Sequence, residues 1–251
     1  MTGSCLEVRN LSKSFGGVMA LSEFDLSVDD GELLCIIGPN GCGKTTFFNL
    51  ISGFAEPSSG EVLFHGHRLS GLAAHKVARL GIGRKFQVPS VYEELTVTQN
   101  LQVATFSKAG QRGIFGLFRH RRDDRVNVSE VLEKVGLSVL ADTQAGYLSH
   151  GQKQWLEIGM LLCTRPRLIL LDEPTAGMTR QETKKTADLI ASLIYHESVS
   201  IVLIEHDMWF VEELDCRVAV MMTGRVIAEG RYEDIRQMRV VQEAYLGSGT
   251  A

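Results

Sequence analysis

The sequence predicts an α/β fold with a parallel sheet at its core, an N-terminal antiparallel β subdomain and an inserted α-helical subdomain. Apolar runs without alternation at residues 33–37, 168–171 and 200–204 are typical of parallel strands buried on both faces. A segment with helical spacing, from about Gln181 to Tyr195, lies between the last two runs. Strands that alternate with helices in this way indicate a parallel sheet with helices packed on it.

The N-terminal residues predict the antiparallel part. Residues 6–9 and 24–28 alternate between apolar and polar side chains, and Gly16-Gly17 between them is a turn signal. Residues 33–37 then lead into a glycine-rich turn, after which Phe47, Leu50 and Ile51 recur at helical spacing. The order strand, glycine loop, helix follows for this part of the chain.

The β pattern lapses between about residues 89 and 148, where residues 130–137 predict a helix stopped by Gly136. We therefore expect a helical subdomain at about 88–164 within a single domain, 1–251. Its α/β core and antiparallel subdomain then comprise about 1–87 and 165–251. Residues 218–222 and 226–228, joined by a Thr223-Gly224 turn, predict a closing hairpin.

Composition narrows the classes of function. Of 251 residues 44% are hydrophobic, enough for an ordinary core, and the formal charge of −4 gives no overall positive field for nucleic acid. No apolar run approaches the roughly 20 residues of a membrane-spanning helix, and the N-terminus has no secretory pattern, so we expect a cytoplasmic chain. Five scattered cysteines without a Cys-x-x-Cys pair favour reduced thiols over disulfides or structural zinc.

The glycine-rich turn matches a phosphate-binding P-loop. Its residues, with Thr46 following, are Gly38, Pro39, Asn40, Gly41, Cys42, Gly43, Lys44 and Thr45. Backbone N–H groups and the helix N-terminus would surround a triphosphate, Lys44 would reach its β- and γ-phosphates, and Thr45 would bind Mg²⁺. A chance glycine turn is the alternative, but the strand and helix on either side favour the P-loop. Because Cys42 lies in the loop, we also hypothesise inhibition by thiol alkylation with protection by MgATP.

Two carboxylates follow the apolar strand at 168–171. This order predicts that Asp172 reaches the Mg²⁺ side of the P-loop site and that Glu173 polarises the attacking water. A core strand ended by solvated acids is the alternative. The P-loop in the same chain favours the catalytic interpretation, which makes ATP and Mg²⁺ the expected cofactors.

Residues 148–152, Leu-Ser-His-Gly-Gln, resemble the signature segment of ABC-type ATPases. The resemblance implies that Ser149, Gly151 and Gln152 contact the γ-phosphate of a nucleotide held by a second ABC ATPase chain. Further residues match the family by type and order, each with a plain structural alternative. Gln87 resembles the glutamine that senses metal and water. His206 resembles the switch histidine, and Phe15 resembles the aromatic residue that stacks on adenine.

Two positions depart from the family pattern. His150 stands where the commonest signature has glycine, and residues 176–179, Ala-Gly-Met-Thr, lack the usual aspartate. Ser149 and Gly151 remain, so we expect phosphate contact to survive the first departure. The second puts in doubt the contact across the dimer that the aspartate makes.

Four segments resemble the ATP-binding subunits of the branched-chain amino-acid transporter group: residues 83–87, 148–160, 176–179 and 205–208. Within this group the ATPases of urea and short-chain amide transporters are the most similar. The resemblance implies an importer ATPase, peripheral at the cytoplasmic face of the inner membrane. Its partners would be a second ATPase chain, homologous or identical, permease subunits and, indirectly, a solute-binding protein outside the membrane. Uptake of urea or a short-chain amide is the first expectation.

Other functions stay open. A branched-chain amino-acid importer ATPase and a non-transport ABC ATPase acting on nucleic acid are the alternatives, the latter disfavoured by the acidic charge and the single cassette. A regulatory scaffold without turnover is disfavoured by Glu173 and His206. Residues 114–122 are apolar and then basic, which fits either a solvated loop or a surface that touches a membrane.

Overall fold

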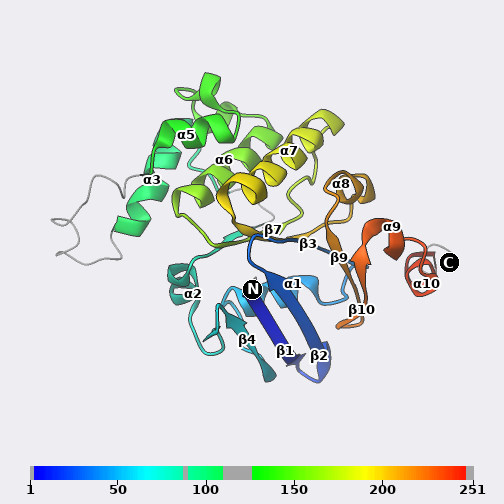
Figure 1. The fold of residues 1–251 in the computed structure, drawn as a ribbon. Helices are drawn as coiled ribbons and strands as arrows, with labels where there is room; N and C mark the ends of the chain where they lie inside the picture. Colours follow the sequence, from blue (N-terminus) through cyan, green and yellow to red (C-terminus); the bar gives the residue numbers. More distant parts are fainter. Residues whose placement is uncertain (1–2, 87–89, 110–125, 247–251) are drawn as a thin grey trace.

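The computed structural model describes residues 3–86, 90–109 and 126–246. Two sheets form the framework of these ranges (Figure 1). The first is antiparallel and has the order β2-β1-β4-β5. Its strands are β1 (Ser4–Phe15), β2 (Val18–Asp29), β4 (Ser59–Phe64) and β5 (His67–Arg68).

The second sheet has the order β10-β9-β3-β8-β7-β6, and all its strands are parallel except the edge strand β10. They are β3 (Leu33–Ile37), β6 (Ile82–Lys85), β7 (Leu168–Asp172), β8 (Ser200–Ile204), β9 (Arg217–Met222) and β10 (Arg225–Arg231). The carboxyl ends of β3, β7 and β8, which are neighbours in this order, therefore meet at one edge of the sheet.

Helices cover both faces of the parallel sheet. They are α1 (Lys44–Ile51), α2 (Ala74–Leu80), α3 (Val97–Ala109), α5 (Val128–Lys134), α6 (His150–Cys163), α7 (Arg180–Glu197), α8 (Met208–Glu213), α9 (Tyr232–Ile235) and α10 (Arg239–Leu246), with 3₁₀ turns at Ser138–Leu140 and Ala145–Tyr147. In Figure 1, α3, α5, α6 and α7 lie above the parallel sheet and the antiparallel sheet lies below it.

Alternating residues of the central strands enter two separate cores. In β3, Cys35 and Ile37 pack into the core beneath α6 and α7, whereas Leu34 and Ile36 face α1 and the antiparallel sheet. Every residue of β7 and of β8 is buried. Burial on both faces is the physical reason why these strands are continuous apolar runs in the sequence.

The predicted fold class is confirmed, and residues 33–37 form β3 as predicted. The helix expected from about 181 to 195 is α7, and the closing hairpin is β9 and β10. β1 and β2 are much longer than the short strands expected, and β4, β5, α2 and β6 were not predicted. In the described part of the 88–164 segment, α3, α5 and α6 are the helices. Gln87 and residues 114–122 lie outside the described residues.

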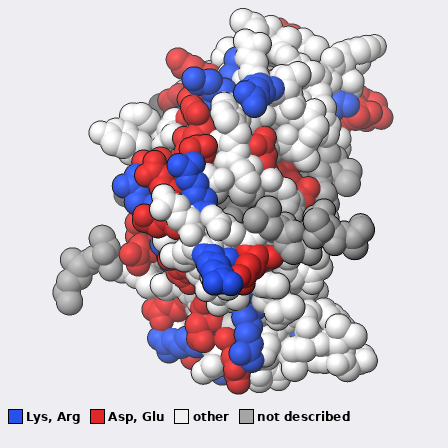
Figure 2. Space-filling model, turned by 90° about the vertical axis from the view of Figure 1, so that its right-hand side faces the viewer, with Lys and Arg blue, Asp and Glu red and all other residues white. Residues whose placement is uncertain are grey.

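None of the helices in the described ranges is long and apolar enough to cross a membrane. On the face shown in Figure 2, acidic and basic side chains are interspersed. Ion pairs tie together elements near β9, β10 and α9. Among them are Arg217–Glu229, Arg225–Glu23, Arg231–Asp215 and Arg236–Glu212.

Candidate active site

The P-loop joins β3 to α1 and passes very close to neighbouring backbone. Gly43, the residue before α1, has φ 111°, and a Cβ at this position would lie 2.5 Å from the Ala20 carbonyl oxygen. A Cβ at Gly38 would lie 2.3 Å from the Met221 carbonyl oxygen. Such contacts exclude a side chain at both positions, so the tight loop requires these glycines.

Lys44 is buried at the start of α1. Its Nζ donates to the carbonyl oxygens of Gly38 at 2.8 Å and Pro39 at 3.0 Å, and it lies 3.9 Å from Cys42 Sγ. The ammonium is thereby held inside the loop, where a triphosphate would offer it stronger, anionic acceptors. Cys42 is itself only 4% exposed, and burial raises the pKa of its thiol although Lys44 opposes the shift.

A cavity of about 170 Å³ joins the P-loop to the carboxyl ends of β7 and β8. Its lining residues are Ala20, Asn40, Gly41, Gly43, Lys44, Thr45, Thr46, Asp172, Glu173, Ile204 and His206. The structure thus brings part of each predicted set, among them Lys44, Asp172 and Glu173, around one space, as expected where neighbouring parallel strands end.

Asp172 is buried at the end of β7. Burial raises the pKa of its carboxyl group, and Arg84, whose Nη2 lies 3.5 Å from Oδ2, acts in the opposite direction. Thr45 lines the same cavity. A hydroxyl and a carboxylate are hard oxygen donors of the kind that Mg²⁺ prefers, so these two residues fit the ion. The third expected ligand, Gln87, lies outside the described residues.

Glu173 faces the histidine expected to act with it. The backbone of Glu173 is in the left-handed region, with φ 46°, and its N–H donates to the Ile204 carbonyl oxygen at 3.0 Å. This bend directs the side chain to His206, whose Nε2 lies 3.3 Å from Glu173 Oε1. A non-glycine residue held in this conformation by its neighbours is typical of functional sites. The pair can hold a water and accept its proton.

Glu205 is a site residue that sequence reasoning missed. Its buried carboxylate accepts hydrogen bonds from the backbone N–H groups of His206 and Asp207 and from both the N–H and the hydroxyl of Thr175. It therefore fixes the His206 segment against the segment that follows Glu173. A carboxylate directly after the apolar run at 200–204 was a signal that could have found it.

The signature segment lies at the N-terminus of α6 and does not line the cavity of its own chain. Ser149 is the N-cap of the helix: its hydroxyl accepts from the Gln152 N–H at 3.2 Å, and Gln152 Oε1 accepts from the Ser149 N–H at 2.9 Å. The Ser149 hydroxyl also donates to Glu182 Oε1 at 3.1 Å. A side chain at Gly151 would place its Cβ 2.7 Å from this same oxygen. The Glu182 carboxylate, also unforeseen, thus lies over the helix N-terminus.

The two departures from the family pattern contact each other. His150 Nε2 lies 3.0 Å from the Ala176 carbonyl oxygen and 3.2 Å from the side-chain nitrogen of Gln154. A Cβ at Gly177 would be 3.5 Å from the His150 ring. The histidine thereby ties the signature segment to the loop that lacks the aspartate, within one chain.

Phe15 is set apart from these groups. It ends β1, is 51% exposed and has Lys13 Nζ 4.8 Å from the centre of its ring. It does not line the cavity. Its expected contact with adenine stays a prediction.

Comparison with known proteins agrees with this geometry. A family model described as "ABC transporter" matches residues 21–176, and one described as "Branched-chain amino acid ATP-binding cassette transporter" matches residues 225–251. The high-affinity branched-chain amino acid transport ATP-binding protein BraF of Pseudomonas aeruginosa is 39% identical over 98% of this chain and 99% of its own length. The corresponding protein LivG of Escherichia coli is 38% identical with the same coverage of both chains.

Solved structures share the fold over nearly the whole chain. An ATP-binding cassette of an ABC transporter, crystallised in its ADP conformation, is 32% identical with a TM-score of 0.84 and covers 98% of this chain and 100% of its own. A dimeric ATP-binding cassette in a post-hydrolysis state with ADP and phosphate is 25% identical, with a TM-score of 0.75 and coverage of 90% and 98%. The P-loop, the carboxylates after β7 and the matches over nearly its full length show that this chain belongs to the ABC transporter ATPases, as an ATP-binding subunit of the branched-chain amino acid transporter group.

Proposed function

We propose that this chain hydrolyses MgATP as one half of a two-chain motor that powers import of a branched-chain amino acid. The observation that carries the ATPase part is the single cavity shared by Lys44, Asp172, Glu173 and His206. The relatives BraF and LivG support the cargo, since both are named for branched-chain amino acid transport. They favour this alternative over the urea or short-chain amide expected first, for which they offer no support.

In the proposed cycle, Lys44 and the P-loop N–H groups bind the phosphates, and Glu173 with His206 holds the attacking water and takes its proton. Mg²⁺, when bound by Thr45 and Asp172, would neutralise charge on the β- and γ-phosphates. Ser149 lies outside its own chain's cavity, which is consistent with a second chain bringing its Ser149 to the γ-phosphate. The dimeric relative supports this pairing.

The mechanical output follows from the shared phosphate. A γ-phosphate that accepts contacts from both chains favours the closed pair, and its removal favours the open pair. We place the motor at the cytoplasmic face of the inner membrane, where permease subunits would be moved between inward- and outward-open states. A solute-binding protein outside the membrane would deliver the cargo.

Replacing Glu173 by Gln tests the ATPase part. The expected variant binds MgATP, accumulates as a dimer and hydrolyses about 10²- to 10⁴-fold more slowly, the usual contribution of a general base. Steady-state phosphate release measures hydrolysis, and light scattering with MgATP measures the dimer, which forms only if the nucleotide binds. Turnover near the wild-type rate would show that Glu173 is not the general base.

Uptake by cells tests the cargo separately. A strain without this chain is compared for uptake of labelled leucine, urea and acetamide, then complemented with the wild-type chain or with Glu173→Gln. Loss of leucine uptake, restored only by the wild type, is the expected result. A loss confined to urea or acetamide would reinstate the other cargo, and unchanged uptake of all three would contradict the importer function.

A further inference from the structure

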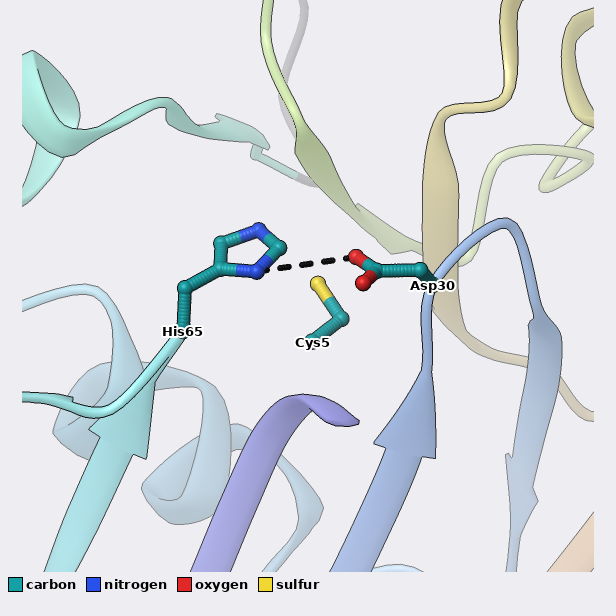
Figure 3. A group of neighbouring side chains, drawn as sticks. All are labelled: Cys5, Asp30 and His65. Carbon is teal, nitrogen blue, oxygen red and sulfur yellow. Dashed lines mark ion pairs between the residues drawn. The ribbon is translucent and has the colours of Figure 1, made fainter. Parts of the chain in front are cut away.

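Three side chains of metal-binding type converge outside the nucleotide site, where β1, the turn after β2 and the end of β4 meet. Cys5 lies in β1, Asp30 in that turn, and His65 directly after β4. They point toward one another in Figure 3, and their sulfur, oxygen and nitrogen ligand atoms all lie within 4.8 Å of one another. His65 Nδ1 is 3.6 Å from Asp30 Oδ1.

These separations are close to those of a zinc site. With Zn–S near 2.3 Å and Zn–N and Zn–O near 2.0–2.2 Å, ligand atoms of a tetrahedral ion are about 3.5 Å apart. The nitrogen and oxygen already meet this spacing, and the remaining separations need to contract by little more than about 1 Å. A thiolate, an imidazole and a carboxylate together favour Zn²⁺ over Mg²⁺ or Ca²⁺, which prefer oxygen donors alone.

Backbone contacts hold the three residues in place without an ion. The Asp30 N–H donates to the Gly3 carbonyl oxygen at 3.1 Å, and the His65 N–H donates to the Cys5 carbonyl oxygen at 2.9 Å. A Cβ at Gly3 would lie 3.2 Å from Asp30 Oδ2, so the glycine leaves room for the carboxylate. His65 has φ 44°, an uncommon conformation for a non-glycine residue.

The environment also suits a bound ion. Cys5 is fully buried, the His65 side chain is 19% exposed, and the Asp30 side chain is 49% exposed. One side of the cluster therefore opens to solvent, which provides an entry path and a place for water. The His65 ring packs on Phe64, with ring centres 4.5 Å apart, and its buried Nε2 has no hydrogen-bond partner among the described residues. Packing on Phe64 and the contact at Nδ1 therefore set the orientation of the ring.

We propose that Cys5, Asp30 and His65 form a zinc-binding site whose fourth ligand is water. None of the three lines the nucleotide cavity, so the site is separate from the nucleotide site. It would join two strands of the antiparallel sheet to the turn that enters β3. In that turn the Gly31 N–H donates to Ser200 Oγ, on β8, at 2.9 Å. Bound zinc would therefore stabilise the junction between the two sheets.

Metal content and thermal unfolding of the full chain test this site. The protein is freed of metal by chelator, dialysed against Zn²⁺ with excess Mg²⁺, and analysed for zinc per chain. The variants are Cys5→Ser, His65→Asn and Asp30→Asn. Asparagine tolerates the left-handed backbone at position 65, and position 30 is exposed enough to accept an amide. Cys163→Ser is the matched control, because Cys163 is buried but is not part of the cluster.

We expect the wild type and Cys163→Ser to retain a single zinc ion and to melt at a higher temperature with Zn²⁺. The three cluster variants should lose both effects while keeping the circular dichroism of the wild type. Co²⁺ should give a thiolate charge-transfer band in the wild type and not in Cys5→Ser. Zinc retention that is unchanged in Asp30→Asn and His65→Asn, or no retention by the wild type, would overturn the proposal.

Discussion

The ion pair between Lys85 and Glu157 allows a quantitative test of how the signature helix is held to the core. Lys85 ends β6, and Glu157 lies in α6. Lys85 Nζ is 3.7 Å from Glu157 Oε2, with side-chain exposures of 0% and 9%. Glu157 Oε1 also accepts from the Ser90 N–H at 2.6 Å. The pair thus connects the signature helix with the strand and the loop on either side of residues 87–89.

Burial dominates the electrostatics of both partners. It lowers the pKa of Lys85 and raises the pKa of Glu157, and in each case the partner charge only opposes the shift. Changing Glu157 to Met leaves the Lys85 ammonium buried without this carboxylate. Breaking a buried pair in this way costs about 3–5 kcal/mol of unfolding free energy. At about 2–4 °C per kcal/mol for a chain of this size, Tm should fall by about 6–20 °C.

The double variant Lys85→Met/Glu157→Met should recover most of this loss. Apolar side chains of similar volume often replace a buried pair at no cost, and what remains is about 1 kcal/mol for the Ser90 N–H that loses its acceptor. Differential scanning calorimetry of the wild type, both single variants and the double variant measures the coupling. The reasoning is refuted if the losses of the two single variants add, within about 0.5 kcal/mol, to the loss of the double variant.

Three further outcomes are expected. Alkylation of Cys42 should be slow at neutral pH and faster as pH rises, because burial raises the pKa of its thiol. MgATP should suppress the reaction. An alkylation rate that is equal with and without nucleotide would argue against the hypothesis. Glu182→Gln should strengthen MgATP-driven dimerisation about two- to fivefold, because it removes a negative charge from the helix N-terminus beside Ser149, where the anionic γ-phosphate is expected. Weaker dimerisation in light scattering would contradict this. Burial in the folded protein raises the pKa of Glu205, so the folded state holds the carboxyl proton more tightly than the unfolded chain does. The stability of the wild type relative to Glu205→Gln should therefore fall as pH rises from the ordinary glutamate pKa to the raised one. Urea titrations across this range would show the opposite slope if the pKa of Glu205 were lowered instead.

Local sequence was sufficient wherever a feature depends on neighbouring residues. The P-loop needs a strand, close backbone approach and a helix start in immediate succession, so its glycines were identifiable from spacing alone. Residues 33–37 were recognisable as a strand because burial on both faces requires an unbroken apolar run. Asp172 and Glu173 were placed by the same logic, since the end of a parallel strand fixes where the next side chains lie.

Tertiary structure decided what depends on segments far apart in the chain. Sequence periodicity does not show that Glu182 reaches Ser149, that His150 contacts Ala176, or that Glu205 binds Thr175, because each contact joins two elements whose relative position is set by packing. The cysteine pattern gave no sign of the proposed metal site for the same reason, because the other two members of the cluster are far from Cys5 in the sequence. Its partners Asp30 and His65 arrive only when the β1 pairings with β2 and β4 bring three distant segments together.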